Sequence, residues 1–194
     1  MRTLLERSGV VDYQVERHNE AWADHQARTL VTGALIAWLK PDSVIDPACG
    51  DGSIVVAADR ANSIKSVLFG DLSAPNITYL ESSQRRHGWE FGVATIADTI
   101  GAYPGPADVV VLTEVLEHLP DPDVVLRLSR FAGRYLVVSS PVMRPGQVDT
   151  NPEHLWQFDR QGYQEMLEGA GWAVQQYTFL HFKSEYDFGI WICS

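Results

Sequence analysis

The sequence lacks most features that mark secreted or membrane-spanning proteins. It has only two cysteines in 194 residues, Cys49 and Cys193, which provide neither a disulfide framework nor a CxxC metal pattern. No apolar run reaches the roughly 18 residues that a membrane helix needs. The charged N-terminal segment has no apolar core like that of a signal peptide. We therefore expect a soluble, cytoplasmic protein with no membrane partner.

Basic residues are scarce. The chain has 15 Lys and Arg against 25 Asp and Glu, which gives a formal net charge of -10. A partner bound mainly through phosphates requires basic groups that release counterions, so nucleic acid is disfavoured. The apolar fraction of 45% suffices for a sizeable core, and the length fits one domain. We expect a single domain over 1–194, with an N-terminal helical cap in 1–40 and a cofactor-binding core in 41–194.

Strand-like and helix-like runs alternate along the chain. The predicted strands cover 43–47, 66–71, 89–95, 107–114, 134–141, 172–182 and 187–194. The predicted helices cover 18–39, 52–61, 75–87, 121–131 and 159–171. This alternation implies a parallel sheet with helices on both faces, and the last two strands should pair as an antiparallel hairpin. The long irregular stretch 141–158 is expected to be functional.

The segment SVIDPACGDGSIVVAA, residues 43–58, places an acid at the end of a strand and two glycines just after it. Ligands of open parallel sheets bind at the carboxyl ends of the strands. Glycines allow close approach of the backbone, and the following helix offers unpaired N–H groups. The loop lacks the Lys-Ser/Thr of a P-loop and is not a clean GxGxxG motif, so a dinucleotide site is weakly supported.

Acids stand at or just after the ends of four successive strands. They are Asp46, Asp71, Asp98 and Glu114. Asp71 lies 19 residues after Gly52, where an acid binds ribose hydroxyls in nucleotide folds. Helix capping explains any one of these acids taken singly. The four together suit a ligand that carries ribose, adenine and a cationic centre without phosphate.

These segments resemble the class I S-adenosylmethionine-dependent methyltransferases. The matching stretches are VIDPACGDG, LFGDLS, ATIADTI and ADVVVLTEVLEHLPDP. The resemblance implies an α/β, Rossmann-like fold with helices on both faces of a seven-stranded sheet. Its strand order would be 3-2-1-4-5-7-6 with strand 7 antiparallel. S-adenosylmethionine is the cofactor that this resemblance implies.

The resemblance also assigns cofactor contacts to the ends of the first four strands. For the methionine part, they are Asp46, Pro47, Ala48, Cys49, Gly50, Thr113 and Glu114. For the ribose and adenine, they are Asp71, Leu72, Asp98 and Thr99. The family usually has Gly where this chain has Pro47-Ala48, and DPACG is more like the amino-methyltransferases that act on DNA. Those enzymes carry an Asn/Asp-Pro-Pro-aromatic motif where this chain has TEVLEHLP, so methylation of a base nitrogen is disfavoured.

A hydroxyl acceptor must lose its proton, either to a base or under the influence of a metal ion. His118 and His154 are the candidate catalytic residues, with structural packing as the alternative. If the turn after the fourth strand is helical, Glu114, Glu117 and His118 share a face. Together with His154, they offer two carboxylates and two imidazoles to a divalent metal such as Mg²⁺, Mn²⁺ or Zn²⁺.

The Glu-x-x-Glu-His turn with a later His looks like the metal site of small-RNA 3′-terminal ribose 2′-O-methyltransferases. A similar turn occurs in ubiquinone-pathway O-methyltransferases. We expect methylation of a small-molecule acceptor, more readily on oxygen than on nitrogen or carbon. The alternatives are a metal-dependent RNA ribose 2′-O-methyltransferase and a non-catalytic nucleotide-binding protein of the same fold.

The acceptor pocket is expected to come from 1–30 and 141–158, and a partner subunit in a homodimer could close it. Trp22, Trp156 and Phe158 are candidates for an apolar lid, although core packing explains each of them singly. Arg28, on the predicted N-terminal helix, is a candidate contact for the cofactor carboxylate, with a solvated helix face as the alternative.

Overall fold

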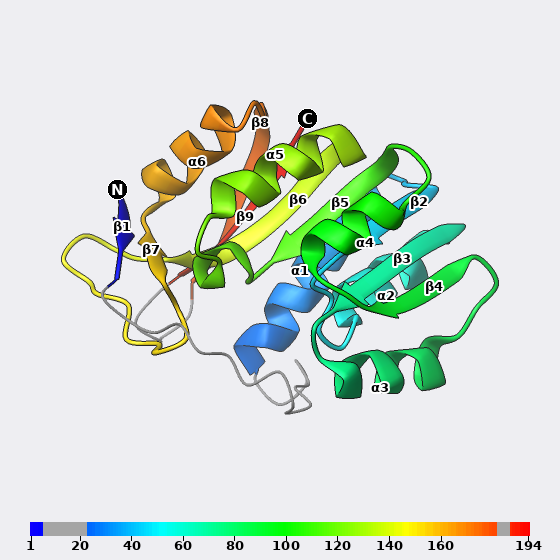
Figure 1. The fold of residues 1–194 in the computed structure, drawn as a ribbon. Helices are drawn as coiled ribbons and strands as arrows, with labels where there is room; N and C mark the ends of the chain where they lie inside the picture. Colours follow the sequence, from blue (N-terminus) through cyan, green and yellow to red (C-terminus); the bar gives the residue numbers. More distant parts are fainter. Residues whose placement is uncertain (6–22, 182–186) are drawn as a thin grey trace.

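The computed structural model describes residues 1–5, 23–181 and 187–194. Its main sheet contains β2 (Ser43–Asp46), β3 (Ser66–Asp71), β4 (Trp89–Val93), β5 (Ala107–Thr113), β6 (Gly133–Val142), β8 (Val174–His181) and β9 (Asp187–Cys193). The strands lie in the order β4-β3-β2-β5-β6-β9-β8 (Figure 1). The first five are parallel, whereas β9 is antiparallel to both β6 and β8. Numbered within this sheet alone, the order is 3-2-1-4-5-7-6 with strand 7 antiparallel, which confirms the predicted architecture.

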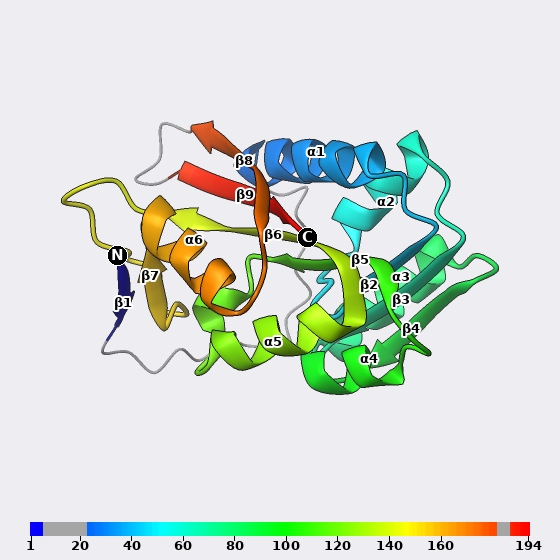
Figure 2. The same cartoon turned by 90° about the horizontal axis from the view of Figure 1, so that it is seen from above.

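Helices cover both faces of this sheet (Figure 2). One face carries α1 (Ala23–Trp38), α2 (Ser53–Ala61) and α3 (Ala74–Gln84), and the other carries α4 (Ile96–Ala102), α5 (Pro122–Ala132) and α6 (Arg160–Gly169). Successive strand residues point to opposite faces. Val109 and Val111 therefore pack with the first group of helices, and Val110 and Leu112 with the second. Because both faces are covered, β5 is apolar almost throughout.

Two short strands form a separate sheet that the sequence pattern did not predict. β1 (Arg2–Leu4) pairs antiparallel with β7 (Trp156–Phe158). The expectation that 141–158 is wholly irregular is therefore wrong, because this stretch holds the end of β6 and all of β7. Strands of three residues are too short for their periodicity to be recognised. Their pairing also joins segments that lie far apart in the sequence.

The connection between β4 and β5 also contains a helix that periodicity did not predict. Thr95 caps the start of α4 by accepting a hydrogen bond from the Asp98 N–H at 3.2 Å. The helix has only seven residues, which is too short for a recognisable apolar stripe. Its capping turn decides the role of Asp98, described below.

The predicted N-terminal helix over 18–39 agrees with α1 from Ala23 onward and ends at Trp38. Its first residues, together with Trp22 of the predicted lid, lie outside the described residues. α1 packs against α2 on one face of the main sheet, where Ile36 is fully buried. No helix within the described residues is long and apolar enough to cross a membrane.

Candidate active site

A cavity of about 310 Å³ lies where the parallel strands end. It is lined by residues that follow β2, β3, β4 and β5, by α1, and by residues from the stretch 151–154. Ligand-binding clefts of proteins have volumes of about 300–1,000 Å³. The cavity occupies the edge at which open parallel sheets bind their ligands. This location agrees with the sequence-based prediction.

Asp71 lines the cavity and holds the glycine loop against the end of β3. Its Oδ2 accepts a hydrogen bond from the Gly50 N–H at 2.8 Å, and its Oδ1 accepts one from the Ser73 N–H at 2.8 Å. Gly50 has a φ of 54°, in the left-handed region that favours glycine. A carboxylate has about four lone-pair sites, so Asp71 can accept further hydrogen bonds from a ligand. The carboxylate is thus fixed in place without being saturated.

Asp46 lies beneath the loop and does not line the cavity. It is 2% exposed, and its Oδ1 has no hydrogen-bond partner among the described residues. Burial raises the pKa of Asp46 well above its ordinary value, and the charges of Asp71 and Asp51 raise it further. Cys49 is buried as well, with a pKa raised mainly by burial, so its thiol is not activated.

Asp98 and Thr99 do not line the cavity, although the family resemblance assigns them to adenine. Asp98 is exposed, and its carboxylate accepts a hydrogen bond from the Thr95 hydroxyl at 2.7 Å. The same hydroxyl accepts from the Asp98 N–H, so both contacts belong to the N-terminal turn of α4. Thr99 is buried, and its hydroxyl donates to the Thr95 carbonyl at 2.9 Å. Leu72, by contrast, is 45% exposed and does line the cavity.

Glu114 directly follows β5 and has a strained conformation with a φ of 54°. Such conformations in residues other than glycine are concentrated at functional sites. Its Oε1 accepts a hydrogen bond from the Ser139 hydroxyl at 2.8 Å and lies 3.6 Å from an Arg28 guanidinium nitrogen. Burial raises the pKa of Glu114, and Arg28 and Ser139 oppose that rise. Thr113 and Glu114 both line the cavity, next to Arg28.

The turn after β5 is a 3₁₀ turn, η2 (Leu116–His118), and Glu114 lies outside it. The helical face that was expected to join Glu114 with Glu117 therefore does not form. Glu117 is 1% exposed, and its Oε2 accepts a hydrogen bond from the Ser140 hydroxyl at 3.2 Å. Burial raises the pKa of Glu117 to about 8, and the negative charge of Glu114 contributes to the rise.

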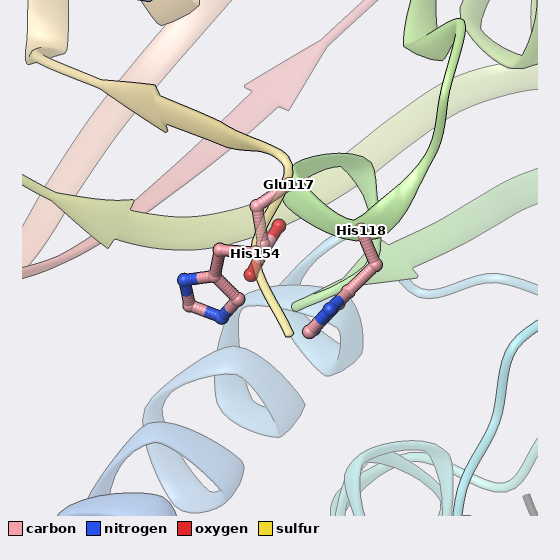
Figure 3. A group of neighbouring side chains, drawn as sticks. All are labelled: Glu117, His118 and His154. Carbon is pink, nitrogen blue, oxygen red and sulfur yellow. The ribbon is translucent and has the colours of Figure 1, made fainter. Parts of the chain in front are cut away.

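His118 and His154 both line the cavity, although one follows β5 and the other precedes β7, far along the sequence. Their ring centroids are 4.7 Å apart, in an edge-to-face arrangement. Glu117 lies beside them, and one potential ligand atom from each of the three residues falls within 4.8 Å of the others (Figure 3). Of the four predicted metal ligands, the structure thus groups three and leaves Glu114 outside.

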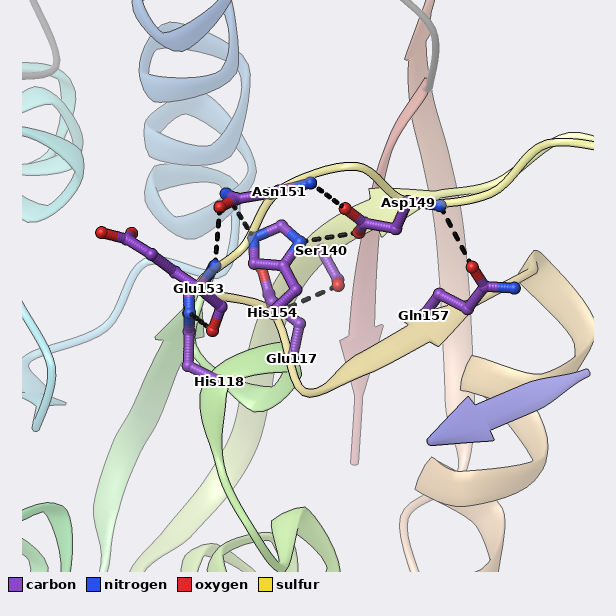
Figure 4. A network of polar contacts seen from close by, with 8 residues as sticks. All are labelled: Glu117, His118, Ser140, Asp149, Asn151, Glu153, His154 and Gln157. Carbon is purple, nitrogen blue, oxygen red and sulfur yellow. Dashed lines mark hydrogen bonds and ion pairs between the residues drawn. The ribbon is translucent and has the colours of Figure 1, made fainter. Parts of the chain in front are cut away.

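Hydrogen bonds determine which ring nitrogens of the two histidines carry protons (Figure 4). His118 Nδ1 lies 3.0 Å from the Glu153 carbonyl, which can only accept, so Nδ1 carries a proton. His154 Nδ1 lies 2.6 Å from Asp149 Oδ2, and its Nε2 lies 3.0 Å from the Asn151 side-chain amide. Asn151 Oδ1 accepts from the Glu153 N–H, which fixes the orientation of that amide. In both neutral rings, Nε2 therefore carries the lone pair.

Sequence reasoning missed the residues that support this arrangement. They are Ser139, Ser140, Asp149 and Asn151. Asp149 is 6% exposed. Burial lowers the pKa of His154. The hydrogen bond that its ring donates to Asp149 and the charges of nearby carboxylates outweigh this effect, so the pKa is raised. The only available signal was the position of Asp149 and Asn151 in the stretch predicted to be functional.

The candidate lid residues within the described part of the chain pack elsewhere. Phe158 is 1% exposed and packs edge-to-face on Tyr163, with ring centroids 5.0 Å apart. Trp156 donates to the Leu119 carbonyl at 2.9 Å and stacks under the Arg2 guanidinium. Neither lines the cavity. Both hold β7 in place, which is the core-packing alternative for these aromatic residues.

The sheet order and the acid-lined cavity at its carboxyl edge define a class I methyltransferase fold. The chain belongs to the methyltransferase-domain family, which it matches over residues 16–177. This result confirms the predicted family and enzyme class, the S-adenosylmethionine-dependent methyltransferases.

Among curated proteins, the chain is similar to a ubiquinone biosynthesis O-methyltransferase of Sodalis glossinidius (strain morsitans). The two are 33% identical over 91 residues, which is 44% of this chain and 34% of that enzyme. The match therefore spans about a third of the curated relative's length.

Two solved structures show the same fold at low sequence identity. The [4+2]-cyclase SpnF has a TM-score of 0.71 and 16% identity, with coverage of 87% of this chain and 81% of that one. Magnesium protoporphyrin IX methyltransferase (ChlM) from Synechocystis PCC 6803, with bound S-adenosylhomocysteine, has a TM-score of 0.65 and 16% identity, with coverage of 88% and 84%. At this level of identity the likeness concerns the fold alone.

Proposed function

We propose that this chain transfers a methyl group from S-adenosylmethionine to a hydroxyl of a small-molecule acceptor. The observation that carries the proposal is one cavity that is lined both by Asp71 and the glycine loop and by His118 and His154. The family match and the partial match to an O-methyltransferase support it. When bound, S-adenosylmethionine supplies a methyl group on a cationic sulfur. An acceptor oxygen can attack the methyl carbon in line with the carbon–sulfur bond, and the sulfur leaves with the bonding electrons.

The residues at the glycine loop fit this cofactor. Asp71 would accept hydrogen bonds from the ribose hydroxyls with its remaining lone pairs. The exposed face of Leu72 would pack on the adenine. The backbone of 47–50 would follow the methionine part, with Thr113 and Glu114 on its other side. The unpartnered Oδ1 of Asp46 lies directly beneath this loop. We assign no adenine contact to Asp98, because it does not line the cavity and its carboxylate is hydrogen-bonded to the Thr95 hydroxyl.

The two histidines that line the cavity, His118 and His154, suit an acceptor hydroxyl. The hydroxyl must lose its proton as the new bond forms. His118 presents Nε2 with a lone pair because its Nδ1 donates to the Glu153 carbonyl. His154 is held in the same tautomer by Asp149 and Asn151. Either ring is therefore suited to remove or stabilise this proton.

Transfer of tritium from labelled S-adenosylmethionine into fractionated cell extract tests the proposal. Label in the small-molecule fraction, lost in Asp71→Ala and strongly reduced in His118→Ala, is the expected result. Label in RNA ends would instead select the ribose methyltransferase, which the net charge of -10 disfavours. Binding of S-adenosylhomocysteine without any transfer would select the non-catalytic alternative. Failure to bind S-adenosylhomocysteine in calorimetry would refute the cofactor assignment.

The single-domain division, the homodimer and the cytoplasmic location are part of the same proposal. Two buried free thiols, Cys49 and Cys193, are consistent with a reducing compartment. Sedimentation of the full chain at several concentrations tests the dimer, since a dimer must dissociate by mass action on dilution.

A further inference from the structure

Glu117 has a carboxylate oxygen for which the protein provides no partner. Its side chain is 1% exposed, and Oε2 is hydrogen-bonded to Ser140, yet Oε1 is buried without a hydrogen-bond partner among the described residues. Leaving a buried polar atom unsatisfied costs about 1–3 kcal/mol, so such an atom requires an explanation. Beside it lie the rings of His118 and His154, with potential ligand atoms within 4.8 Å (Figure 3).

The two imidazoles are held as metal-binding imidazoles usually are. A histidine that ligates a metal through one nitrogen almost always donates the other N–H to a carboxylate or a backbone carbonyl. His154 does so to Asp149, itself 6% exposed, and His118 does so to the carbonyl of Glu153. Figure 4 shows the contact of His154 with Asp149 and that of His118 with Glu153. In this tautomer each ring keeps its lone pair on Nε2, the nitrogen through which it would bind an ion.

We propose that Glu117, His118 and His154 bind a divalent transition-metal ion, with Asp149 as a positioning residue for His154. Two imidazole nitrogens and one carboxylate favour ions such as Zn²⁺ or Mn²⁺ over Mg²⁺, which prefers oxygen ligands. Three protein ligands with an open position are typical of catalytic rather than structural zinc sites. Glu114 is not a ligand, because Ser139 and Arg28 engage its carboxylate.

The Asn151 side chain must move for the ion to bind. The Asn151 amide lies 3.0 Å from His154 Nε2, and it must turn aside to release that lone pair. Asn151 belongs to the loop between β6 and β7, where such a rotation changes no strand pairing. The proposed site therefore exchanges one hydrogen bond to His154 for a bond to the metal.

The position of the site connects it to the proposed function, on which its catalytic role rests. His118 and His154 line the cavity, whereas Glu117 lies behind them. The open positions of the ion would thus face the acceptor, and a metal-bound hydroxyl loses its proton near neutral pH. This would replace general-base catalysis by either histidine. Metal binding itself does not depend on methyl transfer and can be measured without it.

Titration of the metal-free full chain with Co²⁺, followed by visible absorption, tests the site. We expect one ion per chain, with the d–d bands of a four- or five-coordinate complex, and displacement by Zn²⁺. Asp149→Asn should weaken binding by roughly 10–100-fold, and Glu117→Gln should weaken it more. Glu114→Gln, which removes a neighbouring charge but no proposed ligand, is the comparison variant and should weaken binding far less than Glu117→Gln. Circular dichroism confirms that each variant is folded.

Three results would overturn the proposal. The first is the absence of stoichiometric Co²⁺ binding, the second is binding that survives Glu117→Gln, and the third is equal loss in Glu114→Gln. Calorimetry with S-adenosylhomocysteine on the same metal-free protein separates the two proposals. Intact binding of that molecule without Co²⁺ binding would refute the metal site and leave the proposed function standing.

Discussion

Asp149 Oδ2 and His154 Nδ1 lie 2.6 Å apart, and both side chains are almost completely buried. The Asp149 backbone N–H is in turn bound by the Gln157 side-chain oxygen at 3.1 Å (Figure 4). The pair sits in the loop between β6 and β7, outside the regular sheet. It fixes the tautomer of one of the two histidines that face the cavity.

We predict that Asp149→Asn lowers the pKa of His154 in the metal-free protein. The hydrogen bond and charge of Asp149 are what overcome the lowering effect of burial on this ring. The pKa can be followed from the ring proton resonances in an NMR titration. His25, whose pKa is lowered by burial and by Arg28, is the internal control and should not move. An unchanged His154 titration would show that the pair does not control protonation.

The second prediction separates the two acids that the family resemblance assigns to the nucleoside. Asp71→Asn should weaken S-adenosylhomocysteine binding by roughly 10–100-fold, or about 1.4–2.7 kcal/mol, because Asp71 lines the cavity. Asp98→Ala should leave binding unchanged. It should lower the free energy of unfolding by about 1 kcal/mol, because the Thr95 hydroxyl loses its hydrogen bond to the Asp98 carboxylate. Calorimetry and urea unfolding measure the two effects. A comparable loss of binding in both variants would restore the adenine role of Asp98.

The third prediction concerns the pH dependence of stability. The pKa of Glu117 is raised from 4.5 to about 8, so the folded chain retains a proton that the unfolded chain has released. The free energy of unfolding should therefore fall as pH rises from 4.5 to about 8, by about 5 kcal/mol in total. Glu117→Gln imitates the neutral acid and should remove this component. Urea unfolding with a chelator present, at several pH values, gives the comparison, and parallel curves would contradict the prediction.

The fourth prediction concerns the ion pair between Arg28 and Glu114, which connects α1 to the end of β5. Arg28 is 3% exposed, so Arg28→Ala should lower the free energy of unfolding by about 3 kcal/mol at neutral pH. Adding Glu114→Gln should recover part of this loss, since the uncompensated carboxylate is gone. Lys65→Ala breaks the exposed pair with Asp42 and should cost less than about 1 kcal/mol. Additive effects in the double mutant would show that Arg28 and Glu114 do not interact.

The cofactor half of the site was largely predictable because it depends on short, local patterns. An acid at the end of an apolar strand, followed by glycines, marks the edge of a parallel sheet, and Asp71 and Gly50 both line the cavity at this edge. Asp98 shows the limit of that reasoning. A strand-end acid can also cap the next helix, and the residues of α4 are too few for periodicity to reveal the helix.

The sequence by itself determined the alternation of strands and helices and the sheet edge at which the cavity lies, and the family resemblance of its motifs implied the sheet order. Apolar period and turn residues act over a few neighbours, so they can be read along the chain. Tertiary structure alone decided that Glu117, His118 and His154 meet and that Glu114 does not. That outcome depends on a 3₁₀ turn and on the Leu155 N–H donating to the Glu117 carbonyl at 2.8 Å. The β1–β7 pairing holds the same segment in place, and contacts between such distant residues leave no local pattern.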